Sequence, residues 1–132
     1  MDRPNVLVTA TAIVYFVASV GMIFAGEELL TAFQAQRTML ELALIQLLGA
    51  ALFGFAMLNW FHRYSRIGGI LGRPLIVANL AHTMTAALML LQIGRRTGWP
   101  PSLLLGIVLY GSIAIAFGSK LYLPPASPRT GA

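Results

Sequence analysis

The chain of 132 residues contains no cysteine and few charged side chains. Without cysteine it can form no disulfide framework, thiolate metal site or cysteine nucleophile. Charged residues make up 10% of the chain, against about 25% in a typical soluble domain. With four acidic residues and two histidines, the chain has few groups for a metal site or a pair of catalytic carboxylates. We therefore expect no metal and no cofactor.

Apolar residues are abundant, at 58% of the chain, and they gather into four blocks. Each block has roughly the twenty residues that an α-helix needs to cross a hydrocarbon core. The pattern predicts an all-α membrane protein with four transmembrane helices in one up-down bundle and short loops. One domain is expected over residues 1–123, followed by a disordered tail over residues 124–132. The expected spans are residues 5–25, 42–61, 74–94 and 103–123.

The first two blocks have informative ends. The first is expected to be a retained helix, because its apolar part is longer than the core of a signal peptide and lacks a good cleavage site. After it, Leu29, Leu30 and Phe33 could form a brief amphipathic turn. Before the second block, the spacing of Thr38 and Glu41 predicts a capping box. A capping role explains Glu41 without any transport of protons.

The nine basic residues give a net charge of +5 and lie at the ends of the apolar blocks. No nucleic-acid motif accompanies them, so the lipid bilayer is the expected partner and nucleic acid is not. Four spans would put both termini on one side, together with most of the basic residues: Arg3, Arg63, Arg66, Arg73, Lys120 and Arg129. The positive-inside rule then predicts cytoplasmic termini. Arg63, Arg66 and Arg73 are expected to contact anionic lipid head groups.

The third block, "RPLIVANLAHTMTAALML" (residues 73–90), contains Asn79, His82 and Thr83. At 100° per residue these three share one face of a helix. An ionisable residue within a membrane span is rare and normally faces the interior. We therefore expect an inward-facing polar cluster, and matching of helix depths predicts Tyr15 or Ser112 as its nearest partner. The cluster either fixes helix register through hydrogen bonds or forms a ligand or proton site.

Two histidines also raise the question of haem. His62 lies at the end of the second block, whereas His82 is eight residues past Pro74, roughly 12 Å deeper at 1.5 Å per residue. One haem cannot readily bind both histidines at such different depths, so haem ligation is not expected.

Small residues offer places where helices can approach closely in lipid. Ala50 and Gly54 are four residues apart on the second block and form one such candidate seam. Such seams serve packing within one bundle, association into a homo-oligomer or contact with a larger membrane protein. The sequence leaves these three uses open.

The segment "LGAALFGFAMLNWFHRYSRIGGILGRPLIVANLAHT" (residues 48–83) resembles a family of uncharacterised small bacterial four-helix membrane proteins. The shared features are an Asn-Trp pair at the end of the second helix, a Gly-Gly turn with Gly-Arg-Pro, and Asn and His in the third helix. The resemblance implies a bacterial inner-membrane protein and supplies no activity. Small multidrug transporters have the same size but carry a glutamate in the first helix, which is absent here.

Three functions remain after this reading. The first is a non-enzymatic accessory or structural membrane protein, since the sequence offers no nucleophile–base pair, paired carboxylates or cofactor motif. The second is a small transporter or lipophilic-ligand binder that uses the polar face of the third helix. The third and weakest is a quinone or haem redox protein.

Overall fold

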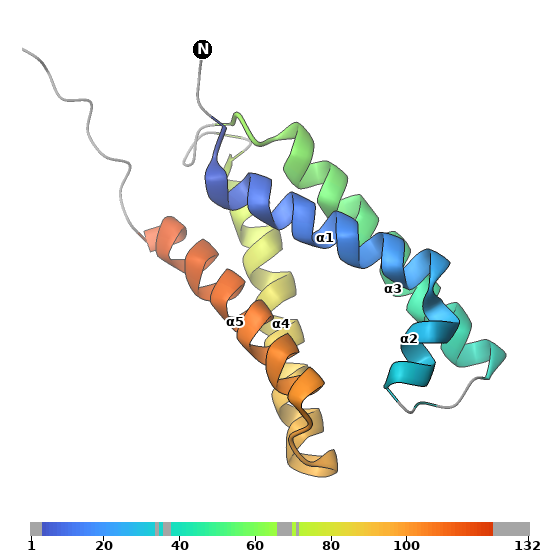
Figure 1. The fold of residues 1–132 in the computed structure, drawn as a ribbon. Helices are drawn as coiled ribbons and strands as arrows, with labels where there is room; N and C mark the ends of the chain where they lie inside the picture. The colour runs from blue at the N-terminus through green and yellow to red at the C-terminus, as the bar shows by residue number, and fades with distance from the viewer. Residues whose placement is uncertain (1–3, 34, 36–37, 66–69, 71, 123–132) are drawn as a thin grey trace, which may run out of the picture. The chain divides into compact units, whose positions relative to one another are not determined.

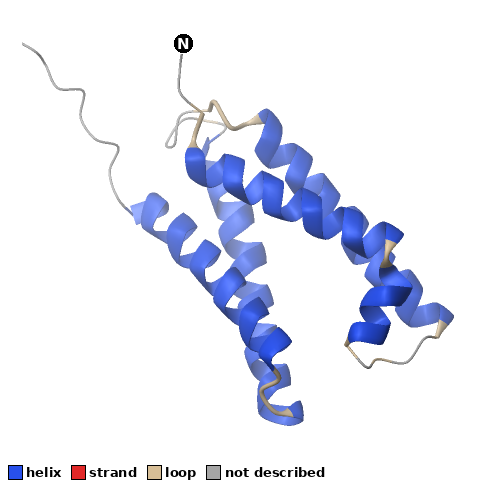
Figure 2. Ribbon diagram, viewed as in Figure 1, coloured by secondary structure: helices blue, strands red, loops and turns tan. Residues whose placement is uncertain are grey.

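The computed structural model describes residues 4–33, 35, 38–65, 70 and 72–122. Nearly all of them lie in five α-helices, and none of the described residues lies in a strand (Figures 1 and 2). The helices are α1 Val6–Phe24, α2 Gly26–Ala32, α3 Met39–Phe61, α4 Gly72–Thr97 and α5 Pro101–Tyr122. All but α2 are long and apolar enough to cross a membrane. The predicted all-α class with four candidate spans is therefore confirmed.

The chain divides into two compact units, each built on a pair of long helices. The first hairpin, Met1–Tyr64, contains α1, α2 and α3, and the second hairpin, Ser65–Ala132, contains α4 and α5. Within them, α1 packs on α3 and α4 packs on α5. The union of both hairpins in one bundle and one domain stays a prediction. The tail, residues 124–132, lies outside the described residues.

The start of α3 is set by the predicted capping box, which is confirmed. The hydroxyl of Thr38 accepts a hydrogen bond from the Glu41 amide at 3.2 Å, and the Glu41 carboxylate accepts one from the Thr38 amide at 3.1 Å. Two amides that would lack partners at a helix start are thereby satisfied. The helix begins at Met39, three residues before the expected span, because the cap lies outside the apolar block.

The turn between α4 and α5 explains why α4 runs past the expected end at residue 94. Gly98 has a φ of 90°, a left-handed conformation that glycine adopts easily, and its amide donates to the Gly94 carbonyl at 3.0 Å. The indole of Trp99 folds back so closely that its Cζ3 atom would lie 2.5 Å from a Cβ placed on Gly94. Gly94 therefore lies inside α4, where the Trp99 ring packs against it. The helix ends before Gly98.

The short helix α2 lies where the amphipathic turn was expected. Its Leu30 is buried and Leu29 is half-buried, whereas Phe33 just beyond its end is 58% exposed. Glu27 and Glu28 occupy its first turn, where the helix dipole favours negative charge. Figure 1 shows α2 folded against the end of the α1–α3 pair, which it contacts on both helices.

The first hairpin is held together by one continuous face on each long helix. On α1 the buried residues are Val8, Thr11, Ala12, Tyr15 and Ser19, and on α3 they are Gly49, Leu52, Ala56 and Asn59. Both sets follow the three- and four-residue spacing of one helix face. Tyr15, Leu52 and Ala56 form the centre of this core, and the Tyr15 ring meets the Phe55 ring edge-on at 6.2 Å between centroids.

The helices α1 and α3 approach each other closely at Gly49. A Cβ atom placed there would lie 2.9 Å from the Cβ of Met22 and 3.2 Å from the carbonyl oxygen of Ser19. By contrast, a Cβ placed on Gly54 meets nothing within 4 Å, and Ala50 is exposed. Within this hairpin the close contact is therefore made by Gly49, one position before the expected pair of Ala50 and Gly54.

Replacement of Gly49 by alanine should destabilise the first hairpin by about 1–2 kcal/mol. Overpacking costs about 1–3 kcal/mol, and the better helix propensity of alanine offsets about 0.5–1 kcal/mol of that cost. Gly54→Ala is the matched control, since its new methyl group enters open space and should leave stability unchanged or slightly raised. SDS titration of the purified protein in micelles, followed by circular dichroism, measures both. Equal losses in the two variants would contradict the described packing.

Candidate functional site

The polar face of α4 is the first candidate site. Asn79 and Thr83 are fully buried, and His82 beside them is half-buried. The Asn79 side-chain amide donates to the Leu75 carbonyl at 2.9 Å, and the Thr83 hydroxyl donates to the Asn79 carbonyl at 2.7 Å. These donors thus bond to the backbone of their own helix, where hydrocarbon would offer them nothing.

His82 has an aromatic neighbour on α5 that the sequence analysis did not name. The imidazole and the Tyr110 ring lie 5.8 Å apart between centroids, at an interplanar angle of 67°. Edge-to-face contact of this kind is a favourable arrangement for aromatic rings. The predicted partner Ser112 is exposed, and its hydroxyl donates to the Leu109 carbonyl at 2.8 Å. Within the second hairpin, α5 therefore meets His82 through Tyr110.

The other predicted partner, Tyr15, lies in the first hairpin. Its side chain is 1% exposed and contacts Phe55 as described above. The structure describes each hairpin by itself, so an approach of Tyr15 to the α4 face stays a prediction.

A second buried polar set lies in the first hairpin and was missed by the sequence analysis. Thr11, Ser19 and Asn59 are each at most 2% exposed. Their donors bond to Leu7, Phe16 and Phe55 carbonyls, at 2.9, 2.7 and 2.8 Å. The burial of Asn59 could have been predicted from its position in the helix. It follows Leu52 and Ala56 at spacings of seven and three residues, so it lies on the same helix face as these buried residues.

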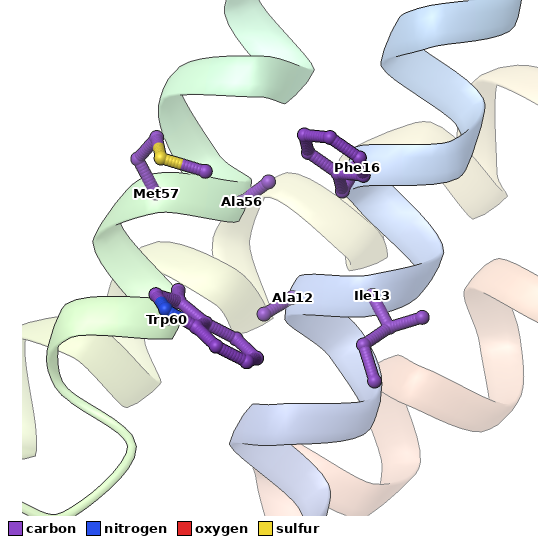
Figure 3. A pocket seen from close by; sticks show the side chains of 6 residues that line it. All are labelled: Ala12, Ile13, Phe16, Ala56, Met57 and Trp60. Carbon is purple, nitrogen blue, oxygen red and sulfur yellow. The ribbon is translucent and has the colours of Figure 1, made fainter.

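An apolar pocket opens between α1 and α3, with a volume of about 300 Å³. It is lined by Ala12, Ile13, Phe16, Ala56, Met57 and Trp60 (Figure 3). In the close-up the four larger side chains surround the two alanines, whose methyl groups leave the space open. This volume is at the lower limit of ordinary ligand pockets, about 300–1,000 Å³. Apart from the indole N–H of Trp60, the side chains that line the pocket are apolar, so it suits an apolar occupant.

Arg63 lies beside this pocket, at the end of α3. Its guanidinium is 4.0 Å from the centroid of the Trp60 ring and 4.7 Å from that of Tyr64, within cation–π range. It also donates to the Trp60 carbonyl at 2.6 Å. Of the other arginines expected at head groups, Arg73 is exposed and Arg66 lies outside the described residues. The contacts of all three with lipid stay predictions.

The histidine at the end of α3 has a local role. A ring nitrogen of His62 lies 2.9 Å from the Leu58 carbonyl oxygen. Among the residues that the structure describes, no three His, Cys, Asp or Glu side chains come together as a metal site would require.

Comparison with protein-family models, with curated proteins and with solved structures found no match for the chain. The resemblance to small bacterial four-helix membrane proteins therefore stays a prediction, and the site must be interpreted from its own geometry.

The contact between His82 and Tyr110 predicts measurable coupling. A double-mutant cycle of His82→Leu and Tyr110→Leu should give an interaction free energy of about 0.5–1.5 kcal/mol, the range for aromatic pairs. The control cycle pairs His82→Leu with Ser112→Ala and should give a value near zero, since the Ser112 hydroxyl bonds to its own helix. SDS titration supplies all of the unfolding free energies. A larger coupling with Ser112 than with Tyr110 would contradict this placement.

Proposed function

We propose that the chain is a small multi-pass inner-membrane protein of the non-enzymatic accessory or structural type. Its work would be to pack helices, against one another or against a partner, without turning over a substrate. The partner would be a second copy of the chain or a larger membrane protein.

One observation carries this proposal. The hydroxyls on the buried helix faces donate to carbonyls of their own helices, as in Thr11, Ser19 and Thr83. A hydroxyl that bonds to the preceding turn acts as a small side chain and lets helices pack closely. A transport path, in contrast, needs polar groups directed at a water-filled route. The bonding pattern therefore supports tight packing as the role of these residues.

Cysteine accessibility tests this proposal, because the chain contains no cysteine of its own. Thr83→Cys should be inert toward a membrane-impermeant thiol reagent if the buried α4 face is dry. A reaction as fast as that of an exposed control, Thr97→Cys, would show a water-filled path and favour the transporter.

Native mass spectrometry of the protein purified with its lipids would then identify which partner is bound. A second copy or another protein supports the accessory role, and a bound small molecule other than a phospholipid contradicts it.

A bacterial inner membrane with both termini in the cytoplasm is the location we propose. The family resemblance supports the membrane, and the excess of basic residues on the terminal side supports the orientation. The link between the hairpins would then be cytoplasmic, and the α4–α5 turn would face outward.

Single cysteines at Ser65 and Thr97 test this orientation. With impermeant reagent, Thr97→Cys should label in intact cells and Ser65→Cys only after the membrane is opened. Ser65 precedes α4 in the chain and Thr97 is its last residue, and at 26 residues α4 is roughly 39 Å long, enough to cross the hydrocarbon core between them. Labelling of both sites from the same side would contradict the orientation and the crossing of α4.

The alternative function is a lipophilic-ligand binder or small transporter. The apolar pocket of the first hairpin favours ligand binding, since its volume and lining suit a lipophilic molecule. The contact of His82 with Tyr110 places a titratable group beside a phenol in the second hairpin, which a proton-coupled mechanism would use.

A further inference from the structure

We propose that the apolar pocket between α1 and α3 binds an acyl chain of an anionic phospholipid, whose phosphate is held by Arg63. This inference requires only that the helices lie in a membrane, so it stands apart from the accessory role. It assigns a binding site and a class of ligand to the first hairpin.

The first step is the depth of the pocket. Trp60 lies one residue before the end of α3, and tryptophan favours the interface between hydrocarbon and head groups. From Trp60 the lining continues to Ala56, one helical turn or about 6 Å further into the span. The pocket thus runs from head-group depth toward the hydrocarbon, the direction in which an acyl chain extends from its glycerol.

The second step is the shape and chemistry of the lining. Ala12 and Ala56 form a narrow base, with 2% and 1% of their surfaces exposed, between larger walls. With a volume of about 300 Å³ the pocket is at the lower limit of small-molecule sites, about 300–1,000 Å³, so it takes a segment of a chain rather than a whole lipid. Among the walls, Met57 is unbranched and adapts to an irregular chain. Such a lining suits part of one acyl chain.

The third step is charge, which selects the lipid. The guanidinium of Arg63 lies over Trp60, a wall of the pocket, so a cation stands at its head-group end. A guanidinium has five N–H donors, and its bond to the Trp60 carbonyl is compatible with another to a phosphate oxygen. The glutamates of α2 and of the first turn of α3 lie at the opposite end of this hairpin. The pocket end near Arg63 therefore favours an anionic head group over a neutral one.

The geometry also holds Arg63 in place. Its carbonyl accepts a hydrogen bond from the Asn5 amide at 2.7 Å, which joins the start of α1 to the end of α3. Asn5 in turn caps α1 by accepting from the Leu7 amide at 3.2 Å. The backbone that carries the cation is therefore fixed to both helices that form the pocket.

Quenching of Trp60 fluorescence by brominated lipids tests the proposal. The chain has two tryptophans, so Trp99→Phe leaves Trp60 as the single reporter. The full-length variant is placed in phosphatidylcholine vesicles that contain either brominated phosphatidylglycerol or brominated phosphatidylcholine. We expect the anionic lipid to associate beside Trp60 about fivefold more strongly, the effect of one basic residue at an anionic surface.

Three further variants, each made with Trp99→Phe, separate the parts of the site. Arg63→Gln should abolish the preference and Arg63→Lys should keep most of it, which distinguishes charge from a structural effect. Arg95→Gln is the matched control, an exposed arginine in the last turn of α4 and outside the first hairpin, and should keep the full preference. Ile13→Phe enlarges an exposed wall and should reduce the preference by filling the pocket. Circular dichroism confirms that each variant is folded.

Several outcomes would overturn the proposal. Equal quenching by both lipids, or a preference that survives Arg63→Gln, would exclude the anionic head group as the ligand of Arg63. A full preference in Ile13→Phe would show that Arg63 attracts lipid without the pocket. Absence of quenching by either lipid would mean that a helix, of this chain or of a second copy, covers the pocket.

Discussion

The hydrogen bond from a buried side chain to a carbonyl one turn earlier on its own helix is the interaction on which the polar faces of this protein depend. Hydrocarbon offers no partner to a polar group, and each unsatisfied one costs several kcal/mol. Thr11 and Thr83 meet this constraint locally, at 2.9 and 2.7 Å, as does one N–H of the Asn79 side-chain amide at 2.9 Å. Because these donors are satisfied before the helices meet, the buried faces can combine polar residues with close packing.

The two hairpins pack their helices in different ways. In the first, Gly49 removes a side chain so that α1 can approach α3, while Ala12 and Ala56 leave a space that is bordered by larger residues. In the second, an aromatic contact between His82 and Tyr110 joins α4 to α5, and Trp99 packs on Gly94 at the turn. Small residues thus produce a helix contact at one position and a pocket at another. A helix contact forms where neighbouring side chains fill the space beside the small residue, and a pocket forms where they do not.

Local and compositional features could be predicted from the sequence. The four spans follow from apolar length, and the capping box of Thr38 and Glu41 from a three-residue spacing within one turn. Features that join distant segments could not. Tyr110 and Ser112 lie two residues apart, and a match of depth alone cannot tell which of them faces His82. The pocket requires Ala12 and Ala56 to face each other across 44 positions of sequence, and no pattern within either helix indicates that.

The turn between α4 and α5 has a consequence for how this protein enters the membrane. Only residues 98–100 separate the two helices, and three residues extend at most roughly 10 Å. That reach is close to the spacing of two packed helices, about 8–10 Å between axes. Pro101 starts α5 at once, with the amides of Leu103 and Leu104 bonded to the Pro100 carbonyl. Because the link is so short, the first residue of α5 stays beside the end of α4 wherever α4 lies, so the entry of one helix into the bilayer is coupled to that of the other.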